Sequence, residues 1–406
     1  MIKGVNLKLS QLGRVRLVIP QKDPKLRPAS GRKRKIIPVC EPKLSGNELK
    51  YISECVRTNW ISSAGNFIKK FEHRFSSSCG AKYAVSCTNG TTALHLALAT
   101  LGISFGDEVI IPTFTMIATA NAITYLGAKP VLVDAEPRTW NIDTARIEKM
   151  ITAKTRAIMP IHTYGHPADM DQILRLAKKY NLYVVEDAAE AHGAKYKGRR
   201  VGSLADIACF SFYANKIITT GEGGILTTNN KRIARTAEIL KNHAFSKQRH
   251  FWHQYLGFNY RLTNLQAAIG LAQMEKFNQL VQARIDNAKY YNSILKNVPG
   301  ITLPPETRGI KSVYWMYSIL IEDDFGISRD QLRKFLAQRG IETRTFFIPM
   351  HLQPIYFKRT RQKFPVAEEL CRKGLYLPSA PTLTKSDIRY ICQCIQSAKK
   401  LREKDK

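Results

Sequence analysis

The stretch of residues 209–224 reads CFSFYANKIITTGEGG and joins an apolar strand to a loop that contains several glycines. The strand delivers Ser211 to its end, and Lys216 follows among apolar neighbours. Desolvation disfavours the ammonium form of an enclosed lysine and so lowers its pKa. The neutral amine can then attack an aldehyde to form an imine. A lone lysine is usually a surface residue, but this setting favours a chemical role for Lys216.

Short apolar strands alternate with amphipathic helices on both sides of this stretch. Strands separated by helices of about ten residues predict parallel βαβ units, with the sheet covered on both faces. Ligands bind such sheets outside the carboxyl ends of the strands. The expected strands are Ala84–Cys87, Val109–Ile111, Pro130–Asp134, Ala157–Ile161, Leu182–Glu186, Ala208–Phe212 and Gly224–Thr228. The expected helices are Thr91–Leu101, Ile117–Leu126, Thr144–Ile151, Met170–Tyr180 and Lys231–Leu240.

The last third of the chain has a different pattern. A long helical run from Asn264 to about Leu295 is followed by a Pro- and Gly-containing boundary at 297–305. Beyond it the sequence predicts a strand at Tyr314–Ile321 and helices at Ser328–Arg339 and Lys385–Ala398. We therefore expect a large α/β domain over residues 36–295 and a smaller C-terminal α+β domain over 296–406.

Charge is concentrated at the start of the chain, whose net charge is +31. Residues 1–36 hold eleven Lys or Arg and one acid, Asp23. The simplest interpretation of residues 1–35 is a disordered, solvated tail. Binding to nucleic acid or to an anionic membrane surface is the alternative, and a transit peptide is disfavoured because the segment lacks an amphipathic apolar stripe.

Three absences narrow the class of protein. No apolar run is long enough to span a membrane, and nothing at the start is typical of a signal peptide. The eight cysteines form no CxxC pair and no cluster with metal-ligand spacing, so no metal site is expected. Several of them lie in apolar runs, which favours reduced core thiols in a cytoplasmic protein.

Two further segments carry polar groups to strand ends. In the first, residues 182–193 (LYVVEDAAEAHG), an apolar strand ends in the carboxylate of Asp187. This carboxylate could anchor a cationic ring nitrogen or cap the following turn. In SCTNGTTALHL, residues 86–96, a strand passes through a polar turn into a helix. The free N–H groups of such a helix start attract phosphate, although capping by Thr91 is an equally good local explanation.

Together these segments resemble the DegT/DnrJ/StrS family of sugar aminotransferases that depend on pyridoxal 5′-phosphate (PLP). The resemblance runs from about residue 37 to the C-terminus. It implies an α/β fold of the PLP-dependent transferase fold type I (aspartate-aminotransferase-like), with a mostly parallel central sheet. The markers are Asn89–Ala93, Pro112–Ala120, His162–Asp171, Glu186–Gly193, Gly198–Asp206, Ser211–Gly224, Asn259–Gln266 and Pro349–Pro354.

The resemblance implies roles for three residues around the cofactor ring. Lys216 is similar to the Schiff-base lysine that also shuttles the proton in catalysis. Asp187 is similar to the partner of the pyridinium nitrogen, which keeps the ring an electron sink. Glu190 stands where members of the family contact the phenolic oxygen of the cofactor, usually with Gln. A Glu at this position leaves open whether the carboxyl group or the phenolic oxygen holds the proton.

The resemblance also implies a phosphate cup and a second subunit. Gly90, Thr91 and Ser211 match the cup, and Asn242 matches an Asn that reaches the phosphate from the neighbouring subunit. A homodimer with shared active sites is therefore expected. Met116 occupies a position where an aromatic residue often stacks on the ring, and a thioether can also pack against an aromatic face.

The family implies transfer of an amino group from L-glutamate to a keto-sugar nucleotide. Strings such as Asn215–Thr220, Val313–Ser318 and Pro349–Pro354 are most similar to members acting on GDP-4-keto-6-deoxy-D-mannose. A UDP- or dTDP-hexose, or an 8-keto octulosonate, would also be compatible with the cofactor residues. Two further hypotheses are a nucleic-acid-binding or regulatory protein and a PLP binder without catalytic activity. The candidate substrate residues are Trp60, Arg261 and His351, each of which could instead serve packing or an ion pair.

Overall fold

The computed structural model describes residues 36–404, except 247, 250 and 358–361. The basic segment 1–35, for which the sequence predicts a disordered tail, lies outside the described residues. Within the part of the chain that is described, no helix combines the length and the apolar character required to cross a membrane.

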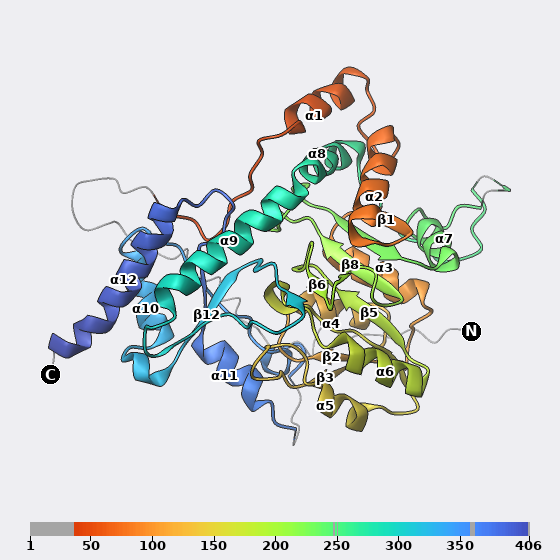
Figure 1. Cartoon of the computed structure of the whole chain (residues 1–406). Helices are drawn as coiled ribbons and strands as arrows, with labels where there is room; N and C mark the ends of the chain where they lie inside the picture. Colours follow the sequence, from red (N-terminus) through yellow and green to blue (C-terminus); the bar gives the residue numbers. More distant parts are fainter. Residues whose placement is uncertain (1–35, 247, 250, 358–361, 405–406) are drawn as a thin grey trace, which may run out of the picture.

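A seven-stranded sheet forms the centre of the molecule (Figure 1), in the order β1-β9-β8-β5-β4-β2-β3. All neighbours pair in parallel except β9, which is antiparallel to both β1 and β8. The reason is the short connection from β8 to β9, residues 212–223, which carries no crossover helix. The strands are β1 (Tyr83–Cys87), β2 (Glu108–Pro112), β3 (Lys129–Val133), β4 (Thr155–Ile158), β5 (Tyr183–Asp187), β8 (Ile207–Ser211) and β9 (Gly224–Thr228).

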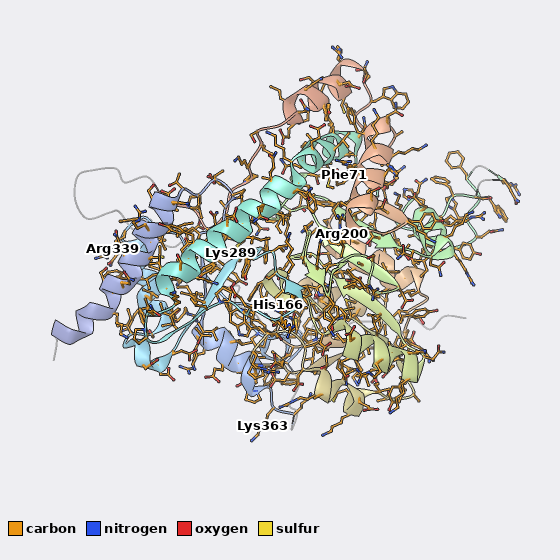
Figure 2. All side chains as sticks on the ribbon, viewed as in Figure 1. Phe71, His166, Arg200, Lys289, Arg339 and Lys363 are labelled. Atoms are coloured by element: carbon orange, nitrogen blue, oxygen red, sulfur yellow. The ribbon has the colours of Figure 1, made fainter. Side chains whose placement is uncertain are left out.

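Helices bury both faces of this sheet, as the sequence predicts. Along β2, Val109 and Ile111 pack in one core and Ile110 in the other, because successive side chains point to opposite faces. Figure 2 shows Phe71, on the second face, where α2 meets α8. The first face is covered by α3 (Gly90–Thr100), α4 (Ile117–Thr124) and α7 (Lys231–Leu240); the second by α2 (Asn66–Cys79), α6 (Met170–Tyr180), α8 (Asn264–Glu275) and α9 (Phe277–Leu295).

The helical run predicted from Asn264 to Leu295 is broken in the structure. The backbone leaves helical geometry at Lys276, whose amine contacts Ser45, so that α8 and α9 are separate helices. Figure 1 shows α9 running from the α8 side of the molecule toward α10 (Arg329–Ala337) and α12 (Lys385–Lys404). The remaining helices of this part are α1 (Glu48–Arg57) and α5 (Thr144–Ile147).

An antiparallel sheet of four strands follows α9, in the order β10-β12-β14-β13. It shares a separate apolar core with α9, α10 and α12. A third sheet, β11-β6-β7, consists of two-residue strands. The elements are β10 (Ile301–Thr302), β11 (Ile310–Lys311), β12 (Tyr317–Ile321), α10 (Arg329–Ala337), β13 (Arg344–Thr345), α11 (Pro365–Lys373), β14 (Gly374–Leu377) and α12 (Lys385–Lys404), with β6 (Lys195–Tyr196) and β7 (Arg199–Arg200). The predicted α/β architecture with a mostly parallel central sheet is confirmed.

Candidate active site

A cavity of about 610 Å³ opens at the carboxyl ends of β5 and β8 and at the start of α3. Asp187 ends β5, and Ser211 ends the neighbouring parallel strand β8. This is the edge of an α/β sheet at which ligands bind. The polar and charged residues that line the cavity include Asn89, Thr91, Thr115, Asp187, Glu190, Ser211, Asn215, Lys216, Glu222, Arg344 and Thr345.

Lys216 extends into this cavity from the loop between β8 and β9. Its backbone N–H donates to the carbonyl of Tyr213 at 2.8 Å, and its Nζ lies 3.8 Å from the ring centroid of Trp315. Among the described residues, this amine has no hydrogen-bond or ion-pair partner. Burial lowers the pKa of Lys216, while the negative charges of Glu190 and Asp187 act in the opposite direction. The cavity therefore holds an uncommitted amine with an increased tendency to be neutral.

Asp187 is a buried carboxylate whose two oxygens are both held. The hydroxyl of Thr119 donates to Oδ2 at 2.7 Å, and the N–H of Ala189 donates to Oδ1 at 3.2 Å. Burial raises the pKa of Asp187, and both hydrogen bonds oppose this rise because they favour the ionised form. The carboxylate is thus fixed in direction at the cavity wall, where it can receive a cationic donor.

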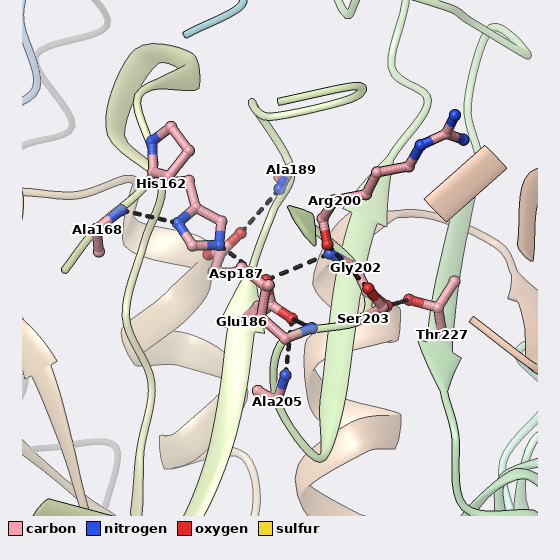
Figure 3. A network of polar contacts seen from close by, with 12 residues as sticks. His162, Ala168, Glu186, Asp187, Ala189, Arg200, Gly202, Ser203, Ala205 and Thr227 are labelled. Atoms are coloured by element: carbon pink, nitrogen blue, oxygen red, sulfur yellow. Dashed lines mark hydrogen bonds and ion pairs between the residues drawn. The ribbon is translucent and has the colours of Figure 1, made fainter. Parts of the chain in front are cut away.

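The residue before Asp187 fixes the end of β5 (Figure 3). Glu186 is fully buried and accepts hydrogen bonds from Nε2 of His162 at 3.1 Å and from three backbone N–H groups. The N–H of Ala168 donates to Nδ1 of His162, so that Nδ1 is an acceptor and Nε2 carries the proton. The three backbone donors to Glu186 are Gly202, Leu204 and Ala205. The sequence markers His162–Asp171 and Gly198–Asp206 therefore hold the strand that presents Asp187.

Glu190 follows three residues after Asp187, lines the same cavity and is buried. The N–H of Tyr164 donates to its Oε2 at 2.7 Å. Burial raises the pKa of Glu190 to about 7, although the charge of Lys216 lowers it. A Cβ at Gly165 would lie 3.1 Å from both the carbonyl of Glu190 and the backbone nitrogen of Trp315. Gly165, at φ +95°, thus brings Glu190 and Trp315 together at the cavity.

The start of α3 forms a polar cup next to Ser211. Asn89 and Thr92 cap the helix reciprocally: the Asn89 side chain accepts from the Thr92 N–H at 2.9 Å, and Thr92 Oγ1 accepts from the Asn89 N–H. The next two N–H groups, of Gly90 and Thr91, are left without an intrahelical acceptor. A Cβ at Gly90 would come within 2.7 Å of the Ser211 Cβ, so glycine keeps the cup open. An anion fits such a cluster of N–H and hydroxyl donors.

Other predicted residues divide between two cavities. Met116, at the N-terminus of α4, is half-exposed and lines the Lys216 cavity. Trp60, Asn242 and Arg261 instead line a separate cavity of about 840 Å³. In that cavity, the Arg261 Nε donates to Asn259 at 2.9 Å. Within one chain, these three residues are therefore not brought to Lys216.

His351 lines neither of these two cavities. Its Nδ1 lies 2.8 Å from the hydroxyl of Thr113, and its Nε2 lies 3.1 Å from a carboxylate oxygen of Glu368. Its ring stacks on Phe364 with a centroid distance of 4.4 Å. These contacts match the packing role that the sequence left open for His351.

Sequence reasoning missed three residues of the site: Thr119, which is buried against Asp187, and two residues that line the Lys216 cavity, Trp315 and Arg344. Thr119 lies within the family marker Pro112–Ala120, and Trp315 lies within the string Val313–Ser318. The sequence therefore indicated both positions, but it assigned no role to either residue. Arg344 lines the cavity from β13, and its nearest carboxylate oxygen, in Glu342, is 3.5 Å away. A two-residue strand gives no periodicity from which Arg344 could have been found.

Comparison with known proteins decides the family. The model of the DegT/DnrJ/EryC1/StrS aminotransferase family matches residues 42–396. The chain belongs to this family. The GDP-perosamine synthase of Caulobacter vibrioides is 48% identical over 353 residues, which span 87% of this chain and 95% of that protein.

Solved structures agree with the family assignment. S. venezuelae DesV, solved in complex with a ketimine intermediate, has a TM-score of 0.82 and 35% identity, covering 87% of this chain and 94% of DesV. The PMP form of a putative sugar aminotransferase, Spr1654 from Streptococcus pneumoniae, has a TM-score of 0.85 and 28% identity, covering 91% of this chain and 99% of that one. The DegT/DnrJ/EryC1/StrS chain described here is thus an aminotransferase by family and by fold, as predicted.

Proposed function

We propose that this aminotransferase binds PLP in the Lys216 cavity and moves an amino group from L-glutamate to a keto-sugar nucleotide, which we take to be GDP-4-keto-6-deoxy-D-mannose. The observation that carries the proposal is the convergence on one cavity of an unpartnered lysine amine, a buried carboxylate and the open start of a helix. These three groups match the aldehyde, the ring nitrogen and the phosphate of PLP.

The donor set fits the cofactor group by group. The N–H groups of Gly90 and Thr91 and the hydroxyl of Ser211 would hold the phosphate, since a helix start favours an anion. Asp187 would hold the ring nitrogen, and Met116 would pack on a ring face. When bound, PLP supplies an electron sink for the charge that develops at the substrate carbon.

The remaining chemistry falls to the protein's own side chains. Lys216 would hold the cofactor covalently, and its amine is placed to carry the proton to and from the substrate carbon. Asp187, fixed by Thr119, keeps its charge directed at one point of the ring. Burial raises the pKa of Glu190 to about 7, so its protonated form is accessible near neutral pH and can donate a hydrogen bond as the amide of Gln would. The Glu at this position thus supports the same contact that other members make with Gln.

The substrate proposal rests on the relatives and on Arg344, a cation of the cavity lining that has no role in the cofactor proposal. The relative that is 48% identical is named GDP-perosamine synthase, which supports a GDP-linked keto-sugar as acceptor and perosamine as the aminated sugar. Arg344 faces the cavity and suits the carboxylate of L-glutamate or a sugar-nucleotide phosphate, because its planar guanidinium binds such groups in a bidentate manner.

A homodimer with shared sites would explain why Trp60, Asn242 and Arg261 lie in a second cavity. The Oδ1 of Asn242 is buried and has no hydrogen-bond partner among the described residues. Large apolar side chains are exposed on α1, on the loop that follows α1 and on the segment between Asn242 and Arg261, which is typical of an interaction surface. They include Val56, Trp60, Ile61, Trp252, Tyr255 and Leu256. We infer that a second copy of the chain covers them and receives Asn242 at its phosphate cup.

The cytoplasm is the proposed location of this reaction. Cys87 and Cys209 are buried thiols that donate to the carbonyls of Asn89 and Ala93, at 3.5 Å and 3.4 Å. Thiols used in this way are typical of a reducing compartment.

A product assay tests the proposed reaction. The purified protein with PLP and L-glutamate is offered GDP-4-keto-6-deoxy-D-mannose, and in parallel a dTDP- and a UDP-4-keto-6-deoxyhexose. We expect the GDP-sugar to be aminated fastest and 2-oxoglutarate to appear in equal amount, as measured by mass spectrometry. Preference for another nucleotide would overturn the substrate, and absence of 2-oxoglutarate with all three would overturn the reaction.

A further inference from the structure

Arg284 is a buried cation in the middle of α9, and its side chain binds uncharged groups. Its Nη1 donates to the carbonyls of Trp315 at 2.6 Å and Ser379 at 3.0 Å. Its Nη2 donates to the carbonyl of Lys216 and to the Sγ of Cys40, both at 3.3 Å. The residue is 2% exposed. One guanidinium thus joins four segments that are far apart in the sequence.

A buried arginine usually has a carboxylate partner, because an unpaired charge is costly in the protein interior. Among the described residues, no carboxylate forms an ion pair with Arg284, and its Nε has no hydrogen-bond partner. An apolar side chain of similar length would avoid the cost of the charge but would leave the carbonyls of Trp315, Ser379 and Lys216 without these donors. The presence of a charged group here indicates that the charge, or its planar set of donors, serves another purpose.

Two of the hydrogen bonds of Arg284 lead to the contact between Lys216 and Trp315. It binds the carbonyl of Lys216, whose Nζ lies 3.8 Å from the ring centroid of Trp315, and it binds the carbonyl of Trp315 itself. The indole Nε1 of Trp315 then donates to the carbonyl of Asn215 at 2.8 Å. Amine and indole therefore depend on one planar group for their relative position.

We propose that Arg284 is a positioning residue for Lys216, which it holds through the backbone and on which its unneutralised charge acts. The inference rests on the proposed function, in which Lys216 binds the cofactor. Arg284 does not itself line the cavity, and it contacts only the backbone carbonyls of two lining residues, Lys216 and Trp315, so it acts through the lysine loop and through Trp315.

The charged groups that face Lys216 are opposed. Burial and the charge of Arg284 favour the neutral amine, whereas the carboxylates of Glu190 and Asp187, and Cys40 when ionised, favour the ammonium form. Loss of the Arg284 charge therefore shifts the balance toward ammonium. Other titratable or charged groups that line the cavity are Tyr213, Glu222, Arg344 and Tyr376.

The test measures the amine itself and does not need turnover. The full chain, freed of PLP, is labelled with trace acetic anhydride across a pH series, and the Lys216 peptide is quantified by mass spectrometry. Arg284→Met removes charge and donors, Arg284→Gln removes the charge but keeps donors, and Arg284→Lys keeps the charge but loses the planar fork. Arg329→Met is the matched control, because Arg329 also donates to two carbonyls, those of Cys371 and Gly374.

We expect the labelling midpoint of Lys216 to rise, by up to about one pH unit, in Arg284→Met and Arg284→Gln, because loss of a nearby positive charge favours the ammonium form. Arg284→Lys should keep the wild-type midpoint, and so should Arg329→Met. If Arg284→Met does not fold, Arg284→Gln decides alone. A wild-type midpoint in a folded neutral variant, or an equal shift in Arg329→Met, overturns the inference.

A second measurement separates this inference from the proposed function. Each variant is incubated with PLP and reduced with borohydride, and the Lys216 peptide is examined for the added mass. We expect trapping in the wild type and slower trapping at neutral pH in Arg284→Gln. No trapping in the wild type would refute the cofactor proposal, while the labelling midpoints would still decide the role of Arg284.

Discussion

At the scale of single residues, the chemistry depends on three titratable groups whose pKa values are shifted by burial. Burial lowers the pKa of Lys216 and raises those of Asp187 and Glu190. Each shift favours the neutral form of its own group, and the opposite charges nearby make each shift smaller. The shifts therefore bring the pKa values of the amine and of the two carboxyl groups closer together.

Asp187→Asn should leave the fold intact and lower kcat by at least about 100-fold, because an amide cannot neutralise a cationic ring nitrogen. The measurement is steady-state turnover with saturating PLP. Thr119→Val is the matched control, since it removes one hydrogen bond to Asp187 but keeps the carboxylate. We expect a much smaller loss in that variant, and equal losses in the two would assign Asp187 to the structure of the turn.

Glu190→Gln should change the pH dependence of stability. The folded-state pKa of Glu190, about 7, lies above the ordinary value, so the folded protein retains a proton that the unfolded chain has released. This contribution is present at low pH and is lost as pH rises through about 7. Relative to Glu190→Gln, the PLP-free wild type should lose on the order of 1 kcal/mol per pH unit between about pH 5 and 7.

Thermal denaturation of the two proteins across this range gives the measurement. The exposed Glu54→Gln serves as the control, and it should follow the wild type. Parallel curves for the wild type and Glu190→Gln would show that Glu190 titrates normally.

At the scale of elements, the carboxyl edge of the sheet presents the site, and the sequence predicts much of it. Apolar runs with β-branched residues located all seven strands of the central sheet to within a residue or two at their starts. The glycine-rich loop after Ser211 and the capped start of α3 marked two walls of the cavity.

Other elements could not be predicted, or were overlooked, for physical reasons. The two-residue strands and Arg344 on β13 depend on tertiary pairing alone, so no local pattern reveals them. Helix α2 was overlooked although Phe67, Phe71 and Phe75 recur at helical spacing and are buried. The break at Lys276, whose amine contacts Ser45 far away in the sequence, is marked by no adjacent glycine or proline.

Gly90→Ala tests whether the start of α3 binds a phosphate group. The new Cβ would lie 2.7 Å from the Ser211 Cβ and would push the two walls of the cup apart. Such overpacking costs about 1–3 kcal/mol, so we expect PLP affinity to fall about tenfold or more. Gly46→Ala is the control, because a Cβ there meets a flexible Glu48 side chain. Unchanged affinity in Gly90→Ala, measured by spectral titration, would remove α3 from the cofactor site.

At the scale of the whole molecule, α9 connects the central sheet to the antiparallel sheet that follows it (Figure 1). Residues from both parts meet at the cavity: Lys216 and Asp187 from one, Trp315 and Arg344 from the other. The division of the chain near residue 295 stays a proposal. Relative movement of the two sheets would change the cavity, and Arg284 lies where it can limit such movement.

Shared active sites predict complementation between inactive subunits. Lys216→Ala lacks the amine, and Asn242→Ala lacks the side chain that we expect to reach the partner's cofactor. Mixed dimers of the two would contain one intact site, so the mixture should regain activity that neither variant has alone. Turnover after mixing and re-equilibration gives the measurement. A mixture that is no more active than the mean of its components would argue against sites built from two chains.

The most direct test of the account is to identify the residue that binds PLP. The purified full chain is incubated with PLP, reduced with borohydride, digested and examined by mass spectrometry. We predict that the added mass lies on Lys216, that the protein is yellow before reduction, and that L-glutamate bleaches this colour. A colourless protein, or a label on another lysine with Lys216 unmodified, would contradict the account.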